Sequence, residues 1–352
     1  MALRYELPEN SSNSNITRML LVWGLPILLW LLVVVFGWMF CFSSDEEEQA
    51  ADEAQQVDNN LFHQQRPNAV PHVAQNSNPI NMGISQYDFS GAYTDIPGIS
   101  NMSGCRSGIL VDVDRHRVLW AKDADKPVAI ASMTKMMTLL LIEEAIAKGS
   151  VKRDAMIKVT DAAYRIGGTQ VWLDPKESFP LSELTKAIAI RSANDASYLV
   201  GEYLASGNIN AFVQSMNVRA KELGMKDTHF YDPHGLGNKA KNQHNMSSAY
   251  DMILLGERLL YYPEIMKLTS TDTAWFRNGK TRLDNSNNLV RKHKIEGVDG
   301  LKTGYTDAAG FCVTFSLKHN GRRFLGCVTG FKKADARDEF CKHLIKWVKE
   351  TN

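Results

Sequence analysis

Three short motifs in the second half of the chain contain the side-chain types that acyl transfer requires. In chain order they are Ser132-Met-Thr-Lys135, Ser192-Ala-Asn194 and Lys302-Thr-Gly304. A serine hydroxyl is a weak nucleophile that needs a base within hydrogen-bond distance, and a buried lysine with a lowered pKa can accept its proton. Each motif alone carries little information, but together and in this order they indicate one active site.

The first motif begins a long apolar segment. Met133–Ile146 contains neither proline nor glycine and has no clean polar face, which predicts a central, buried helix. Residues three apart share a helix face, so Lys135 should lie beside Ser132, whose backbone N–H would face a developing oxyanion. A capping serine and a solvated lysine would be the simpler interpretation of this motif alone. A helix buried on all sides, however, is a poor place for an unused lysine.

The other two motifs are expected in a loop and on a strand. Ser192 and Asn194 follow an apolar stretch, and a short polar loop there could relay a proton and hold a substrate carbonyl. The segment around Lys302 should be a strand whose edge presents a cation, a hydroxyl and a backbone N–H, which suits an extended peptide ending in a carboxylate. Alone, these two motifs would indicate an ordinary turn and a surface strand.

The motifs and their surroundings resemble the serine-type D-Ala-D-Ala carboxypeptidases, which are low-molecular-mass penicillin-binding proteins. The resemblance covers residues 104–352 and includes Ala131-Ser-Met-Thr-Lys-Met-Met-Thr138, Ser192-Ala-Asn-Asp-Ala196, Leu223-Gly-Met-Lys-Asp-Thr-His-Phe230, His234-Gly-Leu236 and Gly297-Val-Asp-Gly-Leu-Lys-Thr-Gly-Tyr-Thr306. A small departure is Ala193, where the family more often has glycine.

The resemblance implies catalytic roles for five side chains. Ser132 would be the acylated nucleophile and Lys135 its base, while Ser192 would pass the proton to the leaving D-alanine. Asn194 would bind the substrate amide, and Lys302 would lower neighbouring pKa values and attract the substrate carboxylate. No cofactor and no metal are implied.

Four further residues are implied to bind substrate. Thr303 would hydrogen-bond the carboxylate, and Gly304 would let the substrate backbone approach closely. The backbone N–H of Tyr305 would complete an oxyanion hole with that of Ser132. Arg337 aligns with an arginine that the family keeps near the terminal carboxylate of the substrate, although an arginine at the start of a helix is often just solvated.

The pattern of elements predicts an α+β fold. We expect strands over 107–113, 118–121, 310–317 and 323–329, a largely helical middle from 132 to about 262, and a final helix over 335–349. Asn320-Gly321 is a strong hairpin signal between the last two strands. Strands at both ends around a helical insert fit one antiparallel sheet flanked by helices with a helical subdomain, the β-lactamase/transpeptidase-like fold that the resemblance implies.

The N-terminal third has a different composition. Residues 19–42 are an uncharged apolar run long enough to span a bilayer, preceded by a polar tail at 1–18 and followed by the acidic Asp45-Glu-Glu-Glu48. The positive-inside rule places the tail in the cytoplasm, so we expect an uncleaved signal anchor in the bacterial inner membrane with a periplasmic catalytic domain. A cleaved signal peptide and a lipoprotein site at Cys41 are weaker alternatives. Residues 43–103 should be a disordered polar tether.

The favoured function is removal of the terminal D-alanine from peptidoglycan stem peptides, with β-lactam antibiotics as covalent inhibitors. Many members carry a further C-terminal β domain, which we do not expect here, because the chain stops one helix after the final hairpin. This departure keeps a D,D-endopeptidase open as an alternative. A class A β-lactamase is disfavoured, because the sequence around Glu222-Leu-Gly224 lacks the glutamate motif of that class. A purely binding domain is disfavoured, because all five catalytic side chains are present.

Smaller signals exclude other classes. The formal net charge of +1 argues against a nucleic-acid partner. The cysteines at 41, 105, 312, 327 and 341 lack metal-ligand spacing. Across the hairpin turn Cys327 should face Thr314 rather than Cys312, so we expect buried free thiols rather than a disulfide.

Overall fold

The structure, a computed structural model, describes residues 85–96, 98–99 and 104–352. Within that part of the chain, no helix combines the length and the apolar character needed to cross a bilayer. The expected cytoplasmic tail at 1–18 and membrane anchor at 19–42 lie outside the described residues.

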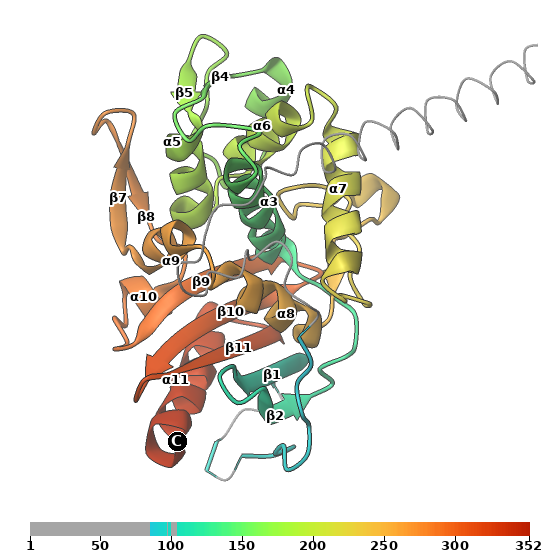
Figure 1. Cartoon of the computed structure of the whole chain (residues 1–352), viewed down its shortest axis with the longest axis vertical. Coiled ribbons are helices and arrows are strands. Elements are labelled where there is room, and N and C mark those ends of the chain that lie inside the picture. Colours follow the sequence, from blue (N-terminus) through green and yellow to red (C-terminus); the bar gives the residue numbers. More distant parts are fainter. Residues whose placement is uncertain (1–84, 97, 100–103) are drawn as a thin grey trace, which may run out of the picture. The chain divides into compact units, whose positions relative to one another are not determined.

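A five-stranded antiparallel sheet joins the two ends of the folded unit (Figure 1). Its strands are β1 (Ser107–Asp112), β2 (Arg117–Lys122), β9 (Val298–Thr306), β10 (Gly310–His319) and β11 (Arg322–Phe331). Their order is β2-β1-β11-β10-β9, which confirms the expected sheet and leaves β9 at one edge. The register pairs Thr314 with Cys327, as the turn at Asn320-Gly321 predicts. In the described part of the chain, the cysteines at 105, 312, 327 and 341 are buried free thiols.

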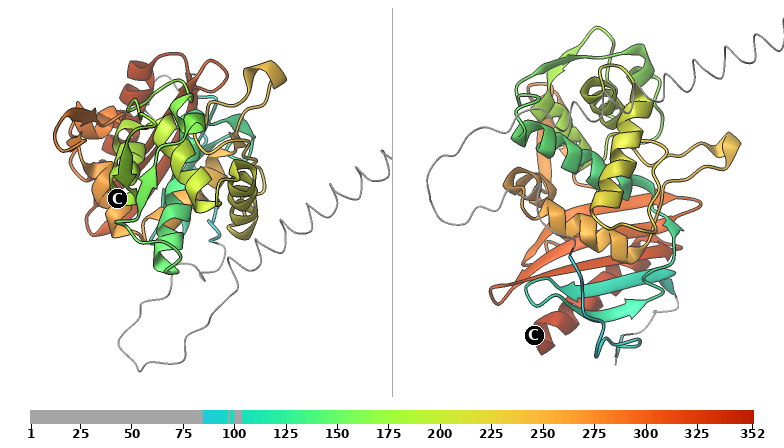
Figure 2. Two further views of the ribbon diagram at one scale, coloured as in Figure 1. Left: turned by 90° about the horizontal axis from the view of Figure 1, so that it is seen from above. Right: turned by 45° about the vertical axis from the view of Figure 1, so that its right-hand side comes forward.

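Helices cover both faces of the sheet (Figure 2). Helix α11 (Ala334–Thr351) packs on one face, where Trp120, Phe315 and Phe340 belong to one hydrophobic cluster. Helix α8 (Ala249–Leu259) lies on the other face, against β1 and β11.

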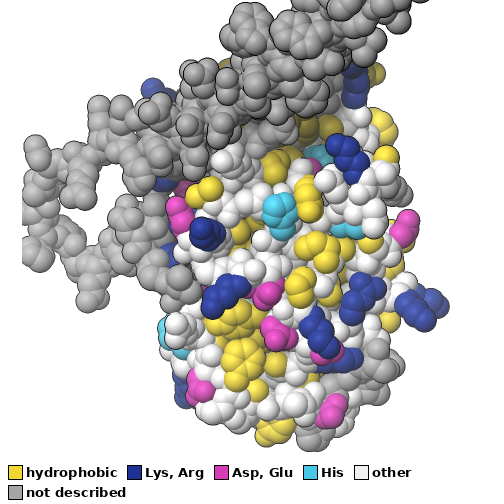
Figure 3. Space-filling view, turned by 90° about the vertical axis from the view of Figure 1, so that its right-hand side faces the viewer, with side chains coloured by type: hydrophobic (Ala, Val, Ile, Leu, Met, Phe, Trp, Pro, Cys, Tyr) yellow, Lys and Arg dark blue, Asp and Glu magenta, His cyan; other side chains and the backbone are white. Residues whose placement is uncertain are grey.

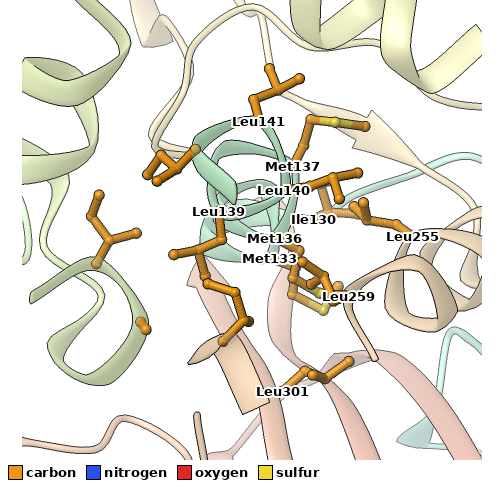
Figure 4. Close-up of a cluster of buried hydrophobic side chains, with 14 of the residues drawn as sticks. Ile130, Met133, Met136, Met137, Leu139, Leu140, Leu141, Leu255, Leu259 and Leu301 are labelled. Atoms are coloured by element: carbon orange, nitrogen blue, oxygen red, sulfur yellow. The ribbon is translucent and has the colours of Figure 1, made fainter. Parts of the chain in front are cut away.

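Helix α3 (Lys135–Ala147) is the centre of a second hydrophobic cluster (Figure 4). Side chains on every side of α3 are buried, and Leu255 of α8 and Leu301 of β9 pack near them. The expectation of a central buried helix is therefore confirmed, since a helix that is apolar all round must be covered all round.

The remaining elements form the helical subdomain and its connections. They are α4 (Asp161–Tyr164), α5 (Leu181–Lys186), α6 (Asn194–Leu204), α7 (Ile209–Glu222), α9 (Pro263–Ser270) and α10 (Asn288–Arg291), with three short strand pairs. The strand pairs are β3 (Val128–Ala129) with β6 (Met246–Ser247), β4 (Met156–Lys158) with β5 (Ser178–Pro180), and β7 (Thr273–Phe276) with β8 (Thr281–Asp284).

The folded unit begins earlier than the expected residue 104. Tyr87 and Ile96 are buried, and the segment containing them forms two isolated bridges with β2. Tyr87 belongs to the hydrophobic cluster around α3 and Ile96 to the cluster under α11, a role that the surrounding Gln- and Asn-rich composition concealed. Residues 85–96, which fall within the tether predicted over 43–103, thus contact the folded unit, and the residues of the predicted tether before 85 lie outside the described part.

Basic and acidic side chains are interspersed on the face drawn in Figure 3. The described residues on that face form no continuous patch of one charge sign.

Candidate active site

Ser132 and Lys135 meet as the sequence spacing predicts. Residues Ala131–Thr134 form a 3₁₀ turn that leads directly into α3. The Lys135 amine lies 3.0 Å from the Ser132 hydroxyl. Ser132 is partly exposed whereas Lys135 is fully buried, so the serine is accessible to solvent and the lysine is not.

The Lys135 amine is enclosed by oxygen atoms. It donates to the Asn194 side-chain oxygen at 2.6 Å and to the His234 carbonyl at 2.5 Å. Burial lowers the pKa of Lys135 to about 7, and the nearby charges of Asp232 and Asp195 only partly oppose this shift. A lysine with such a pKa is neutral in a large fraction of molecules at physiological pH and can accept a proton from the adjacent hydroxyl.

The second motif lies at a tight turn between helical segments. Ser192 ends a π-helical turn over Ala187–Arg191 in a left-handed backbone conformation, and it is almost fully buried. Asn194 begins α6, and its amide nitrogen donates to the carbonyl of Gly167 at 2.9 Å. The expected polar loop is thus confirmed.

The third motif lies on the edge strand β9. Lys302 is buried, and its amine donates to the Thr303 carbonyl at 3.0 Å and to the Ser286 hydroxyl at 3.4 Å. Burial lowers the pKa of Lys302 well below its usual range, and the positive charges of Lys135 and Arg337 add to this effect. Both hydrogen-bond partners of Lys302 are neutral, so an incoming carboxylate would supply the missing counter-charge.

Close backbone contact joins β9 to the turn that carries Ser132. A β-carbon at Gly304 would lie 2.6 Å from the carbonyl oxygen of Ile130 and 3.2 Å from the backbone nitrogen of Met133. Glycine therefore lets the third motif approach the first. Tyr305 follows with an exposed ring that stacks on Phe311 at 4.1 Å between centroids.

Arg337 is close enough to affect Lys302 but is not open to solvent. Its guanidinium pairs with Asp338 at 2.6 Å and donates to the Cys312 carbonyl of β10 at 3.1 Å. The side chain is only 3% exposed, so in this structure it acts as a fixed positive charge behind the sheet.

Two contributors to the site have no signature among the motifs. The hydroxyl of Ser286, just after β8, accepts a hydrogen bond from the Thr303 hydroxyl at 3.0 Å and another from the Lys302 amine. Asp232 accepts hydrogen bonds from the backbone N–H groups of His234 and Gly237 at 2.8 and 2.7 Å. Although burial opposes it, the bond from the His234 ring helps to hold the pKa of Asp232 below its usual range. The aspartate thereby fixes the loop whose carbonyl contacts Lys135, an Asx-type turn that Asp-Pro-His-Gly could have suggested.

Solved structures define the class to which this fold and site belong. A penicillin-binding protein from Listeria monocytogenes in its ampicillin-bound form is 28% identical, with a TM-score of 0.62 over 69% of this chain and 96% of that chain. The chain therefore has the penicillin-binding-protein fold.

The family follows from the sequence comparison. A family model described as D-alanyl-D-alanine carboxypeptidase matches residues 100–333, so the chain belongs to this family. D-alanyl-D-alanine carboxypeptidase DacF of Bacillus subtilis is 40% identical over 228 residues, which are 64% of this chain and 57% of that protein. A D-alanyl-D-alanine endopeptidase of Haemophilus influenzae is 30% identical over 217 residues, 61% of this chain and 70% of that protein. The chain spans 57% and 62% of the length of two curated carboxypeptidases that it matches.

Proposed function

We propose that the protein is a serine D,D-peptidase that removes the terminal D-alanine from peptidoglycan stem peptides. The observation that carries the proposal is the 3.0 Å contact between the Ser132 hydroxyl and a buried Lys135 whose pKa is lowered to about 7. Membership of the D-alanyl-D-alanine carboxypeptidase family supports the same activity.

In the proposed acylation step, Lys135 takes the proton of the Ser132 hydroxyl while the oxygen attacks the carbonyl carbon of the penultimate D-alanine. The backbone N–H groups of Ser132 and Tyr305 stabilise the resulting oxyanion. The carbon–nitrogen bond then breaks, and Ser192 passes a proton to the leaving amine. Water hydrolyses the acyl-serine, which restores the free hydroxyl and releases the shortened stem.

The edge strand supplies the proposed carboxylate site. Lys302 provides a cation and Thr303 a hydroxyl, while Gly304 allows the peptide backbone to approach β9. Because β9 is the last strand of the sheet, a substrate can pair with it as an added strand. Arg337 contributes positive potential from behind β10.

Cleavage of cross-links is the second candidate activity, and similarity to a named D,D-endopeptidase supports it. The deciding experiment incubates the protein with monomeric pentapeptides and cross-linked dimers and identifies the products by mass. Loss of one D-alanine from the monomer would support the carboxypeptidase. Cleavage of dimers with intact monomers would establish the endopeptidase instead. In both cases, a Ser132→Ala variant should be inactive, and wild-type activity in that variant would overturn the mechanism.

We infer that β-lactams acylate Ser132 and form a long-lived adduct, since a related penicillin-binding protein is described in an ampicillin-bound form. A labelled penicillin should remain on the protein for many minutes. Fast turnover of penicillin would favour the β-lactamase alternative.

For location, we propose a single-pass anchor at 19–42 in the bacterial inner membrane with the folded unit on the periplasmic side. The apolar run supports the anchor, and Arg4 and Arg18 before it, with the next Lys or Arg only at Arg66, support the orientation. The full chain should remain in the membrane fraction after carbonate washing, whereas deletion of residues 1–42 should release it. Recovery of the full chain in the soluble fraction would contradict the proposal.

A further inference from the structure

Trp172 combines two features that are costly in a folded protein. Its side chain is 75% exposed, the most exposed of the large hydrophobic side chains in the described residues. Its backbone has φ 57°, in the left-handed region that a bulky side chain rarely adopts. Neither feature stabilises the fold, so another requirement must maintain them.

Arg277, in the turn between β7 and β8, clamps the backbone at this position. Its guanidinium donates to the carbonyls of Val171 and Trp172, each at 2.5 Å. Two further bonds at 2.8 Å to the Glu177 carboxylate orient the guanidinium. The guanidinium also lies 5.0 Å from the centre of the Phe276 ring.

The other side of the loop is bound to the start of α6. The Asp195 carboxylate accepts the N–H groups of Val171 and Leu173 at 3.2 and 3.1 Å. Asn194 donates its backbone N–H to the Thr169 carbonyl at 2.7 Å. Trp172 is therefore held from both sides in a loop attached to Asn194, a contact of Lys135.

The geometry points to Trp172 as a substrate contact for the stem-peptide residues that precede the terminal D-Ala-D-Ala. This inference rests on the proposed function. The carboxylate end would lie on β9, whereas the loop of Trp172 is hydrogen-bonded to the start of α6 at Asn194, whose side chain contacts Lys135. An extended peptide advances about 3.3 Å per residue, so the residues preceding the cleaved bond must continue past Ser132. The indole offers a broad apolar surface for their aliphatic side chains and peptide planes.

The test compares a long with a short substrate. Trp172→Ala should lower kcat/KM for a pentapeptide stem about tenfold through a higher KM. It should leave hydrolysis of N-acetyl-D-Ala-D-Ala and the rate of penicillin acylation unchanged. Trp172→Phe keeps a flat ring and should retain most of the wild-type value. Trp275→Ala is the matched control, because this tryptophan is also exposed, at 56%, but lies on β7 outside the loop.

Binding gives a second readout that does not need turnover. In a Ser132→Ala background, Trp172→Ala should weaken pentapeptide binding about tenfold in calorimetry. An equal loss for the pentapeptide and the dipeptide, or no loss for either, would overturn the inference. Absence of hydrolysis by the wild-type protein would overturn the proposed function instead, and the binding measurement would still decide the role of Trp172.

Discussion

The protonation state of the Lys135 amine should control the rate of acylation. Because burial brings its pKa to about 7, the neutral form dominates above that pH and the charged form below it. The rate constant for penicillin acylation should therefore fall about tenfold per pH unit below 7 and level off above it. Stopped-flow measurements with a fluorescent penicillin would check this. A flat profile between pH 5.5 and 9 would rule out Lys135 as the base.

Ser286 should tune carboxylate binding through Lys302 and Thr303. Ser286→Ala removes a hydrogen-bond partner from both side chains, and a typical bond contributes about 1 kcal/mol, or roughly fivefold. We expect kcat/KM for a D-Ala-D-Ala peptide to fall by that factor. Ser270→Ala is the control, because its exposed hydroxyl bonds to the Lys267 carbonyl of its own helix. Equal kcat/KM values for Ser286→Ala and Ser270→Ala would show that Ser286 has no role in carboxylate binding.

Residue types predicted part of this site and missed the rest for a physical reason. Ser132 and Lys135 are recognisable because residues three apart share a helix face, which brings the proposed nucleophile next to its proposed base. Ser286 acts through a contact between β9 and the segment after β8, and a serine among asparagines has no spacing that indicates such a contact. Sequence alone also could not show that the guanidinium of Arg337 donates a hydrogen bond to the Asp338 carboxylate.

At the scale of elements, the loop containing Gly235 packs directly against the turn that carries Ser132. A β-carbon there would lie 2.1 Å from the carbonyl oxygen of Ala131, and the backbone has φ +93°. Gly235→Ala should displace the turn of Ser132 and abolish most penicillin acylation. Gly279→Ala is the matched control, since φ is +86° there but the space is open.

The control variant should lose only about 1–2 kcal/mol from left-handed backbone strain, without loss of acylation. Thermal unfolding and labelled penicillin would measure both effects. Similar acylation by the two variants would show that the contact with Ala131 is unimportant.

Apolar patterns predicted the helices and strands but not the irregular turns between them. The buried run after Ser132 and the hairpin at Asn320-Gly321 have strong local signals. The 3₁₀ turn at Ala131–Thr134 and the π-helical turn at Ala187–Arg191 instead adjust backbone winding to bring side chains together. Hydrophobic periodicity does not distinguish such turns from an ordinary α-helix.

At the scale of the whole molecule, a buried ion pair connects α3 to α7. Arg219 donates to the Glu144 carboxylate at 2.9 Å, and both side chains are at least nine-tenths buried. Arg219→Ala removes the hydrogen-bonded partner of the buried Glu144 and should reduce the free energy of unfolding by about 3–5 kcal/mol. Differential scanning calorimetry would measure the loss, while acylation at low temperature should persist, because Glu144 is near the end of α3 away from Ser132.

Replacing both charged side chains by neutral ones shows whether the loss of stability comes from an unpaired charge or from lost packing. The double variant Glu144→Gln with Arg219→Met should recover much of the stability. Equal destabilisation in the single and double variants would show that the charge of Glu144 is not the cause.

The pairing of β1 with β11 has a consequence for synthesis. The Thr329 side chain bonds to the Ser107 carbonyl across 222 residues, and the two strands lie side by side along their length. Contacts so distant in sequence form late in folding. The ribosome must therefore deliver nearly the whole chain before the sheet can close. Any step that needs an unfolded polypeptide, such as threading through a narrow pore, has that interval in which to act.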